Sequence, residues 1–126
     1  MELSIAIVGA TGIVGQEFVM ILEEKKQIKV KELRLFAGAG SLGEVMTYNG
    51  KSIRIKELSE GCFKGCDVAF FSAGQEVSAK WAPQAVKEGA FVIDNSSAFR
   101  MNKEVSLVVP EVNAEMIPKK SKPEII

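Results

Sequence analysis

The stretch that decides the fold is IAIVGATGIVG, residues 5–15. Its first four residues are a short, apolar and mostly β-branched run that stops at Gly9, which is typical of a central parallel strand covered on both faces. Beyond the glycines, apolar side chains recur at helical spacing, at Val14, Phe18, Ile21 and Leu22. This pattern predicts an amphipathic helix, so that a strand, a glycine turn and a helix follow one another directly.

The rest of the chain continues to alternate between strands and helices. Runs rich in β-branched and aromatic residues predict strands at 32–37, 68–71, 91–93 and 107–109. A helix is predicted at 77–87, where Pro83 requires either a late start, with the proline in the first turn, or a kink.

One hairpin signal interrupts this alternation. Residues 45–55 place Asn49-Gly50 between two alternating segments, which predicts a hairpin that leaves the sheet. Together the elements predict an α/β, Rossmann-like fold: a mostly parallel twisted sheet with helices on both faces and a small hairpin excursion. Ligands of such sheets bind beyond the carboxyl ends of the strands. Small or polar turns stand at those ends, at 9–15, 72–74 and 94–97.

The composition is that of an ordinary globular protein. The 126 residues, 47% hydrophobic and 25% charged, are the size of one domain. Lys and Arg number 16, as do Asp and Glu, so no basic excess indicates nucleic-acid binding. Met1–Ser4 lacks a basic leader and the first apolar run breaks at Gly9, so we expect a cytoplasmic protein that binds no membrane. Cys62 and Cys66 are four apart with no second cluster, which predicts packed thiols and no metal site.

Gly9, Gly12 and Gly15 stand where a nucleotide pyrophosphate requires glycine. Such a ligand needs free backbone amides, no Cβ at the closest approach and a helix dipole behind it. The spacing G-x-x-G-x-x-G departs from the commonest G-x-G-x-x-G fingerprint, but its place between a strand and a helix favours dinucleotide binding over a plain tight turn. Thr11 adds a hydroxyl that either caps the helix or contacts phosphate.

The loop after the second predicted strand bears on the choice of cofactor. NAD-specific domains place an acidic residue there to bind the ribose hydroxyls, whereas this chain has AGAGSLG at 37–43. The missing acid favours NADP, and since the loop has no Arg, Ser41 and the backbone amides around Gly40 would hold the 2′-phosphate. NAD stays an alternative cofactor, and a plain surface loop is the alternative interpretation.

The last residues bear on domain organisation. Residues 118–123 form a basic connector, and Glu124–Ile126 resembles the first residues of a strand. We therefore expect residues 1–126 to be one dinucleotide-binding domain, cut off before a catalytic and substrate-binding domain.

Five segments, in this order, resemble a known family. They are GATGIVG at 9–15, LFA at 35–37, FSAG at 71–74, DNSSAFRM at 94–101 and VVPEVN at 108–113. With them, the whole chain resembles the cofactor-binding part of aspartate-semialdehyde dehydrogenases. The resemblance implies an NADP-dependent oxidoreductase of lysine, threonine and methionine biosynthesis, which reductively dephosphorylates aspartyl phosphate to the semialdehyde.

The resemblance also implies a set of site residues. Residues against the cofactor phosphates would be Thr11, Gly12, Ile13 and Val14. Residues against the nicotinamide-side ribose and pyrophosphate would be Ser72, Ala73 and Gly74, with Asn95 nearby. Arg100 would bind the phosphate of a small phosphorylated substrate, which suits a permanently charged, bidentate guanidinium. The intact enzyme would be a homo-oligomer assembled mainly through its other domain.

The catalytic residues that the resemblance implies do not occur in this chain. In the family, a Cys of an Asn-x-x-Cys segment attacks the aldehyde and a His serves as acid and base. The chain has no His, and neither Cys62 nor Cys66 lies in such a segment. It also has Gly40 where the family usually has an Arg. We therefore assign no catalytic residue and expect residues 1–126 alone to be inactive.

Three alternatives share parts of the pattern. The cofactor half of an N-acetylglutamyl-phosphate reductase would carry similar turns. A stand-alone dinucleotide-binding module without catalysis would end naturally at Ile126. A short-chain reductase needs Tyr and Lys four apart on one helix face, whereas Tyr48 and Lys51 are three apart across the predicted hairpin turn.

Overall fold

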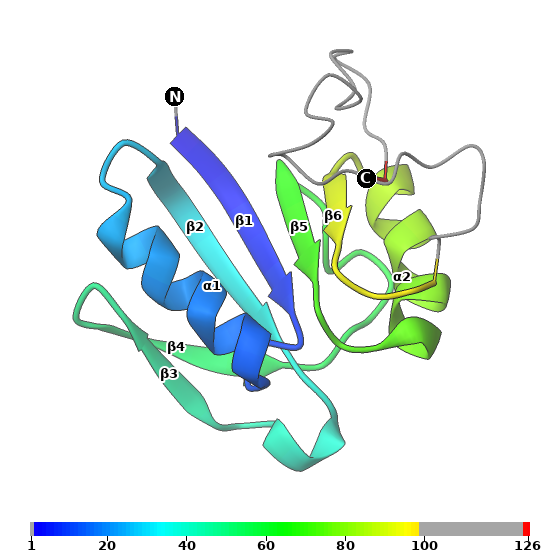
Figure 1. Cartoon of the computed structure of the whole chain (residues 1–126), viewed down its shortest axis with the longest axis horizontal. Coiled ribbons are helices and arrows are strands. Elements are labelled where there is room, and N and C mark those ends of the chain that lie inside the picture. Colours follow the sequence, from blue (N-terminus) through cyan, green and yellow to red (C-terminus); the bar gives the residue numbers. More distant parts are fainter. Residues whose placement is uncertain (1, 99–124) are drawn as a thin grey trace.

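A computed structural model describes residues 2–98 and 125–126. The elements follow one another as β1 (Glu2–Val8), α1 (Ile13–Glu24), β2 (Lys29–Phe36), the short 3-10 helix η1 (Ala39–Ser41), β3 (Val45–Tyr48), β4 (Lys51–Lys56), β5 (Val68–Phe71), α2 (Gln75–Lys87) and β6 (Phe91–Asp94). Strands and helices therefore alternate as predicted, with one hairpin between β2 and β5 (Figure 1).

The strands form one sheet in the order β3-β4-β2-β1-β5-β6. β1 pairs in parallel with β2 on one side and with β5 on the other, and β6 pairs in parallel with β5. The chain thus builds outward from β1 in one direction and then crosses back to build in the other. The strand order therefore reverses at β1, with β2 on one side and β5 on the other. The carboxyl end of β1 is the topological switch point of a doubly wound sheet. The predicted Rossmann-like class is confirmed.

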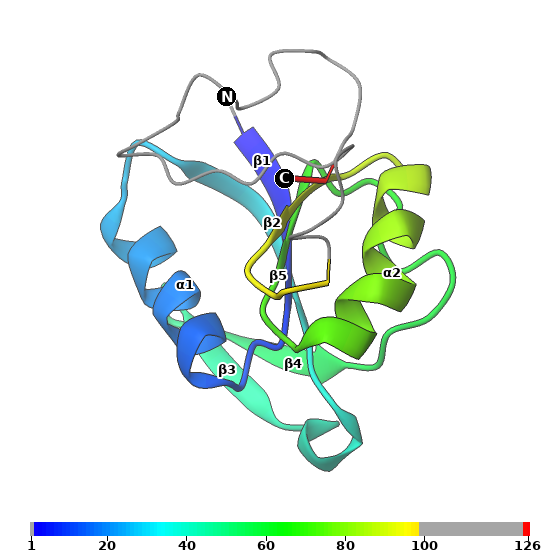
Figure 2. The same ribbon diagram turned by 45° about the vertical axis from the view of Figure 1, so that its right-hand side comes forward.

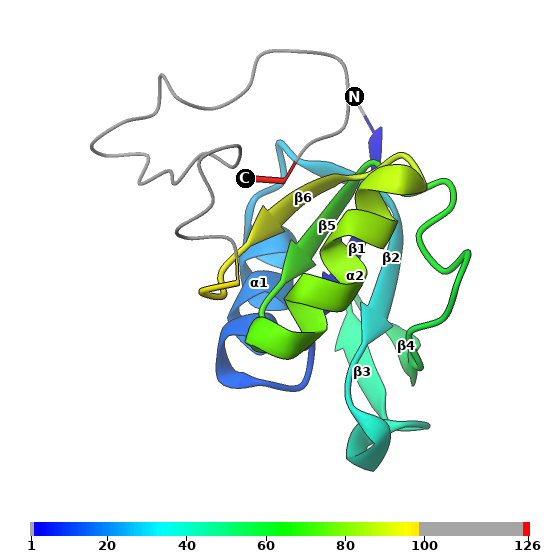
Figure 3. The same ribbon diagram turned by 90° about the vertical axis from the view of Figure 1, so that its right-hand side faces the viewer.

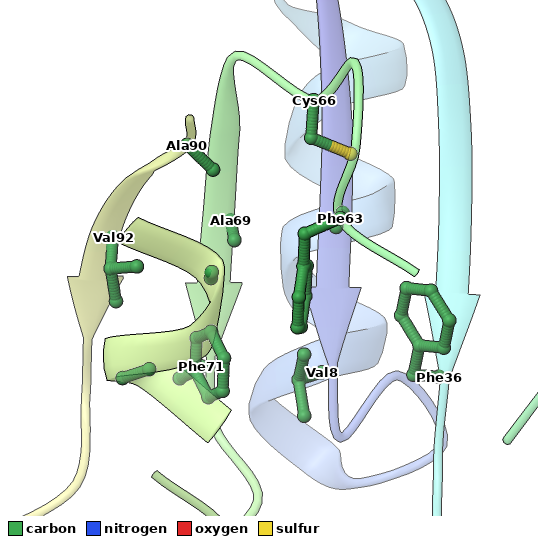
Figure 4. Packing of buried hydrophobic residues seen from close by; sticks show 11 residues of the cluster. Val8, Phe36, Phe63, Cys66, Ala69, Phe71, Ala90 and Val92 are labelled. Atoms are coloured by element: carbon green, nitrogen blue, oxygen red, sulfur yellow. The ribbon is translucent and has the colours of Figure 1, made fainter. Parts of the chain in front are cut away.

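β1 divides its side chains between two cores, as the alternation of a strand requires. Ile5 and Ile7 pack with residues of α1 in one cluster, and Ala6 and Val8 pack with residues of α2 in the other. The two helices accordingly lie on opposite faces of the sheet (Figures 2 and 3). On the α2 side, the rings of Phe36, Phe63 and Phe71 fill the space around Val8 (Figure 4).

Two of the four apolar positions predicted for α1 meet the core: Leu22 is buried, and Phe18 packs against the same cluster. Gly15, Val19 and Leu22 are buried, whereas Val14 and Ile21 are 41% and 42% exposed. Gly15, which an apolar count ignores, is also on the buried side, and it packs against the backbone of the preceding turn: a Cβ there would lie 2.1 Å from the Gly9 carbonyl oxygen. The buried face of this helix therefore combines backbone packing at Gly15 with the apolar side chains of Val19 and Leu22.

α2 begins at Gln75 and continues through Pro83, so the predicted late start is wrong. Its sheet-facing side consists of Ser78, Ala82 and Ala85, and Pro83 lies on the exposed side. The proline has no amide to donate to the carbonyl of Ala79, and because Ala79 is exposed as well, water can bind that carbonyl.

The Asn49-Gly50 hairpin forms as predicted, but it does not leave the sheet. Both turn residues have positive φ, 48° and 78°, as a two-residue hairpin turn requires. β4 then pairs in parallel with β2, through Leu35 with Ile55 and Phe36 with Lys56. The hairpin extends the sheet by two strands, because Ile55 completes the core beneath α1.

The last two residues lie beside β6. Ile125 forms a parallel bridge with Val92, the Ile126 amide donates to the Val92 carbonyl, and the Asp94 amide donates to the Ile126 carbonyl. This pairing agrees with the strand start predicted for these residues. The predicted strand at 107–109 and the connector at 118–123 lie outside the described residues. Among the residues described, no helix has the length and apolarity needed to span a bilayer.

Candidate functional site

The carboxyl ends of β1, β2, β5 and β6 lie along one edge of the sheet (Figure 1). The turns that leave these ends are 9–12 after β1, 37–43 after β2, 72–74 after β5 and 95–98 after β6. They contain every predicted cofactor residue apart from Ile13 and Val14, which begin α1. Arg100, the predicted substrate-phosphate ligand, lies outside the described residues.

The turn after β1 is locked to both neighbouring strands. The amides of Gly9 and Ala10 donate to the Phe36 carbonyl over 2.8 and 3.0 Å, and the Ser72 amide donates to the Val8 carbonyl over 2.9 Å. Gly9 has φ 89°, and a Cβ on it would lie 2.5 Å from the Ser72 carbonyl oxygen. Only glycine fits this position, where the backbones of two turns touch at the switch point.

The amino end of α1 is open to a ligand. Gly12 is its N-cap residue, no side chain caps it, and its first turn contains no acidic residue. The first amides of a helix have no partner within the helix and carry the positive end of its dipole. Gly12 is exposed and Ile13 is 86% exposed, so these amides face accessible space. Such an end suits an anion, a phosphate above all.

The Thr11 hydroxyl lies 3.1 Å from the Ser41 hydroxyl. This contact joins the turn after β1 to the loop after β2. Of the two roles predicted for Thr11, capping of α1 is wrong, because Gly12 is the N-cap residue and no side chain caps the helix. A Cβ on Gly38 or Gly40 would meet nothing within 4 Å, so this loop is bordered by open space. No residue from 37 to 43 carries a charge.

The second half of the site lies at the ends of β5 and β6. Gly74, with φ 98°, is the N-cap residue of α2, and residues 73–77 line an open hollow of about 460 Å³. The Asn95 amide donates to the Phe71 carbonyl over 2.8 Å, which brings the two turns together. The predicted residues Ser72, Ala73, Gly74 and Asn95 thus lie in two adjacent turns, which together border this half of the candidate site.

A polar cluster behind this border was missed by the sequence analysis. The hydroxyl of Ser78, which is 0% exposed, donates to Asp94 Oδ1 over 2.9 Å. The same carboxylate accepts hydrogen bonds from the amide and hydroxyl of Ser96. The sequence did contain a sign of this cluster. Ser78 stands one helical turn before Ala82 and two before Ala85, so its hydroxyl lies on the apolar face of the helix, where it needs a buried partner.

Both cysteines lie in the segment between β4 and β5, outside the turns of the candidate site. Cys66 is buried and Cys62 is half-buried, which confirms the predicted packed thiols. Burial raises the pKa of both, that of Cys66 to about 11. At neutral pH both are protonated, so neither is an activated nucleophile.

Tyr48 and Lys51 are register partners on the two strands of the hairpin, and Tyr48 is buried in the core beneath α1. Burial also raises the pKa of the Tyr48 hydroxyl. A short-chain reductase requires this pair on one helix beside the cofactor, and the structure contradicts that alternative.

A doubly wound sheet with a glycine turn at its switch point and an open helix end behind that turn defines a dinucleotide-binding domain. The family described as "Semialdehyde dehydrogenase, NAD binding domain" matches residues 4–120, and the chain belongs to this family.

Relatives and solved structures agree with this assignment. The chain is 50% identical over 127 residues to an aspartate-semialdehyde dehydrogenase of Aquifex aeolicus, a match covering 100% of the chain and 37% of the relative. It is similar to the crystal structure of aspartate semialdehyde dehydrogenase II from Vibrio cholerae, with TM-score 0.86 and 44% identity over 91% of this chain and 34% of that one. The Candida albicans enzyme, solved with NADP, gives TM-score 0.75 and 30% identity over 90% of this chain and 35% of that one. The chain spans about a third of the length of these relatives.

Proposed function

We propose that residues 1–126 form the NADP-binding domain of an aspartate-semialdehyde dehydrogenase. The observation that carries this proposal is the open amino end of α1, which Gly9 and Gly15 hold at the switch point of the sheet. The chain that forms this sheet belongs to a family of dehydrogenase cofactor domains. The relatives named above are aspartate-semialdehyde dehydrogenases, which favours an aspartyl over an N-acetylglutamyl substrate.

The residues at the carboxyl edge fit this cofactor. Its pyrophosphate would lie against the turn after β1 and the first turn of α1, where Thr11, Ile13 and Val14 would bind it. Gly9 and Gly12, whose amides donate to the carbonyls of Phe36 and Gly9, would shape this turn and let the ligand approach. Its nicotinamide half would meet Ser72, Ala73, Gly74 and Asn95 at the ends of β5 and β6. When bound, the cofactor supplies a hydride acceptor or donor; the protein residues here bind it, orient it and present one face of it.

NADP is favoured over NAD by the loop after β2. Its residues 37–43 lack the carboxylate that would bind a ribose and repel a 2′-phosphate. The Ser41 hydroxyl, positioned by Thr11, and the amides around Gly40 would hold the 2′-phosphate.

The proposed reaction of the intact enzyme is the reductive dephosphorylation of aspartyl phosphate to the semialdehyde, and it needs residues other than those of this chain. Covalent catalysis requires a thiolate beside a base, whereas Cys62 and Cys66 have raised pKa values and the chain has no His. The role of residues 1–126 would be binding alone, with Arg100 presented to the phosphate of the substrate. The intact enzyme would be a cytoplasmic homo-oligomer, and no turnover of the semialdehyde is expected from residues 1–126.

The test is calorimetric titration of the chain with NADP and with NAD, using Gly12→Asp as the probe. Aspartate is a favourable N-cap residue, so this variant should fold at least as stably as the wild type. Its carboxylate would occupy and repel the phosphate position, so NADP binding should be lost. Gln27→Asp adds the same charge at an exposed position beyond the other end of α1 and should leave binding unchanged. Unchanged NADP affinity in Gly12→Asp, or an absence of binding in the wild type, would refute the proposal.

A further inference from the structure

Asp94, at the end of β6, organises the turn that follows it. Its Oδ1 accepts hydrogen bonds from the Ser78 hydroxyl and the Ser96 amide, each over 2.9 Å. Its Oδ2 accepts one from the Ser96 hydroxyl over 2.9 Å, and that hydroxyl in turn accepts one from the Ala98 amide over 3.1 Å. The carboxylate is therefore engaged in holding backbone and side chains in place.

The same turn is fastened to α2 at two points. The first is the bond from Ser78, whose hydroxyl has no exposed surface and comes from the buried face of the helix. The second is a hydrogen bond of 3.2 Å from the Ser97 hydroxyl to the side-chain carbonyl of Gln75, the first residue of α2. The turn 95–98 and the amino end of α2 thus form one unit.

This unit belongs to one half of the proposed cofactor site. In a doubly wound sheet the adenosine half of a dinucleotide lies over the strand that follows the glycine turn, which is β2, and the other half lies across the switch point. β5 and β6 are on that other side of β1. The turn 95–98 therefore borders the nicotinamide half, and the adenosine half is remote from it.

We propose that Asp94 is a positioning residue, whose carboxylate fixes the turn 95–98 against α2 so that Asn95 meets the nicotinamide half of the cofactor. The proposal rests on the proposed NADP-binding function. In this role Asp94 acts through the turn, because its carboxylate is already bonded to Ser78 and Ser96. Its contribution should therefore appear only with ligands that reach that turn.

The test compares two ligands of different reach, NADP and adenosine 2′,5′-bisphosphate, which lacks the nicotinamide half. In Asp94→Ala the affinity for NADP should fall about tenfold, since several charge-assisted hydrogen bonds are lost. The affinity for the bisphosphate should stay within about twofold of wild type. Asp94→Asn keeps a carbonyl oxygen for Ser78 and the Ser96 amide and should restore most of the NADP affinity.

Asp67→Ala is the matched control. Asp67 also stands at a strand end and accepts a backbone amide, that of Ser4 over 2.8 Å, but at the amino edge of the sheet. It should alter neither affinity. Unfolding midpoints of all variants show whether each is folded under the binding conditions.

Equal weakening of both ligands in Asp94→Ala, unchanged NADP affinity, or a comparable effect of Asp67→Ala would overturn the positioning role. Failure of the underlying function has a different signature, because the wild type would then bind neither ligand.

Discussion

Replacing Gly15 by alanine tests whether backbone packing between α1 and the turn after β1 stabilises this domain. The added Cβ would lie 2.1 Å from the Gly9 carbonyl oxygen and 2.8 Å from the Ala10 Cα, both backbone atoms. No rotamer change relieves such contacts, so α1 must move away from the turn by about an ångström. The Gly9 carbonyl also accepts the Gly12 amide over 3.1 Å, and that bond would be strained with it.

The expected loss of stability is about 2 kcal/mol. Overpacking of a tight contact costs about 1–3 kcal/mol, and loss of the hydrogen bond between Gly12 and Gly9 adds about 1 kcal/mol. Replacing a helical glycine by alanine returns about 1 kcal/mol. For a chain of this size, the balance corresponds to a melting temperature lowered by about 8 °C.

Urea unfolding and thermal melts of the wild type, Gly15→Ala and Gly12→Ala measure this effect. In Gly12→Ala the new Cβ meets only the Gly9 oxygen, at 3.4 Å, and φ is −74°, which alanine adopts freely. The small cost of alanine as an N-cap residue is offset by the lower entropy of its unfolded chain, so the change should stay within about 0.5 kcal/mol. If Gly15→Ala proves as stable as wild type, or if both variants lose the same amount, the reasoning from packing is wrong.

Two further outcomes are expected. Gly40→Arg should raise the affinity for NADP relative to NAD about tenfold by calorimetry, because the added side chain enters open space and a guanidinium pairs with a 2′-phosphate; an unchanged ratio would remove the 2′-phosphate from this loop. Stability should fall as pH rises between 9 and 11, because the pKa of Cys66 rises from 9.0 to about 11 on folding, so that the unfolded chain releases a proton that the folded chain keeps. Urea unfolding should show a shallower fall in Cys66→Ala than in the wild type; identical slopes would contradict the raised pKa.

The central strands were predictable because their signal is local. Ile5–Val8 is buried on both faces, and Val68–Phe71 is buried on one face and half-buried on the other, so a continuous apolar run indicates each of them directly. The hairpin turn was predictable because Asn49 and Gly50 tolerate positive φ.

Long-range pairing accounts for what the sequence did not show. β2 begins at Lys29, before the predicted residue 32, because Lys29 and Val30 pair with Glu2 and Leu3 and not because of their own composition. The hairpin joins the sheet through contacts between β2 and β4, which no pattern within the hairpin records.

The candidate site also has one part with a local sequence signal and one part that depends on long-range contacts. The glycine turn was predictable from its spacing between a strand and a helix, but the structure gives Gly9 and Gly15 a different reason from the one predicted: a Cβ on either would collide with the backbone of a neighbouring turn. The anchoring of Asp94 by Ser78 was not predictable, because it depends on the rotation of α2 over the sheet, and a serine in a helical pattern is counted as polar surface.

The contact between Thr11 and Ser41 connects two parts of the proposed cofactor site. Thr11 belongs to the turn proposed for the pyrophosphate and Ser41 to the loop proposed for the 2′-phosphate, and their hydroxyl oxygens are 3.1 Å apart. Since residues 37–43 include no Lys or Arg, this loop would hold the proposed 2′-phosphate with single hydroxyl and amide donors, without the bidentate charge pairing of an arginine. Such donors are effective only when they are correctly aligned. The alignment of Ser41 depends on Thr11, and that of Thr11 on the turn that Gly15 fixes against Gly9. If NADP binds as proposed, its selection over NAD would therefore depend on the same backbone packing as the binding of its pyrophosphate.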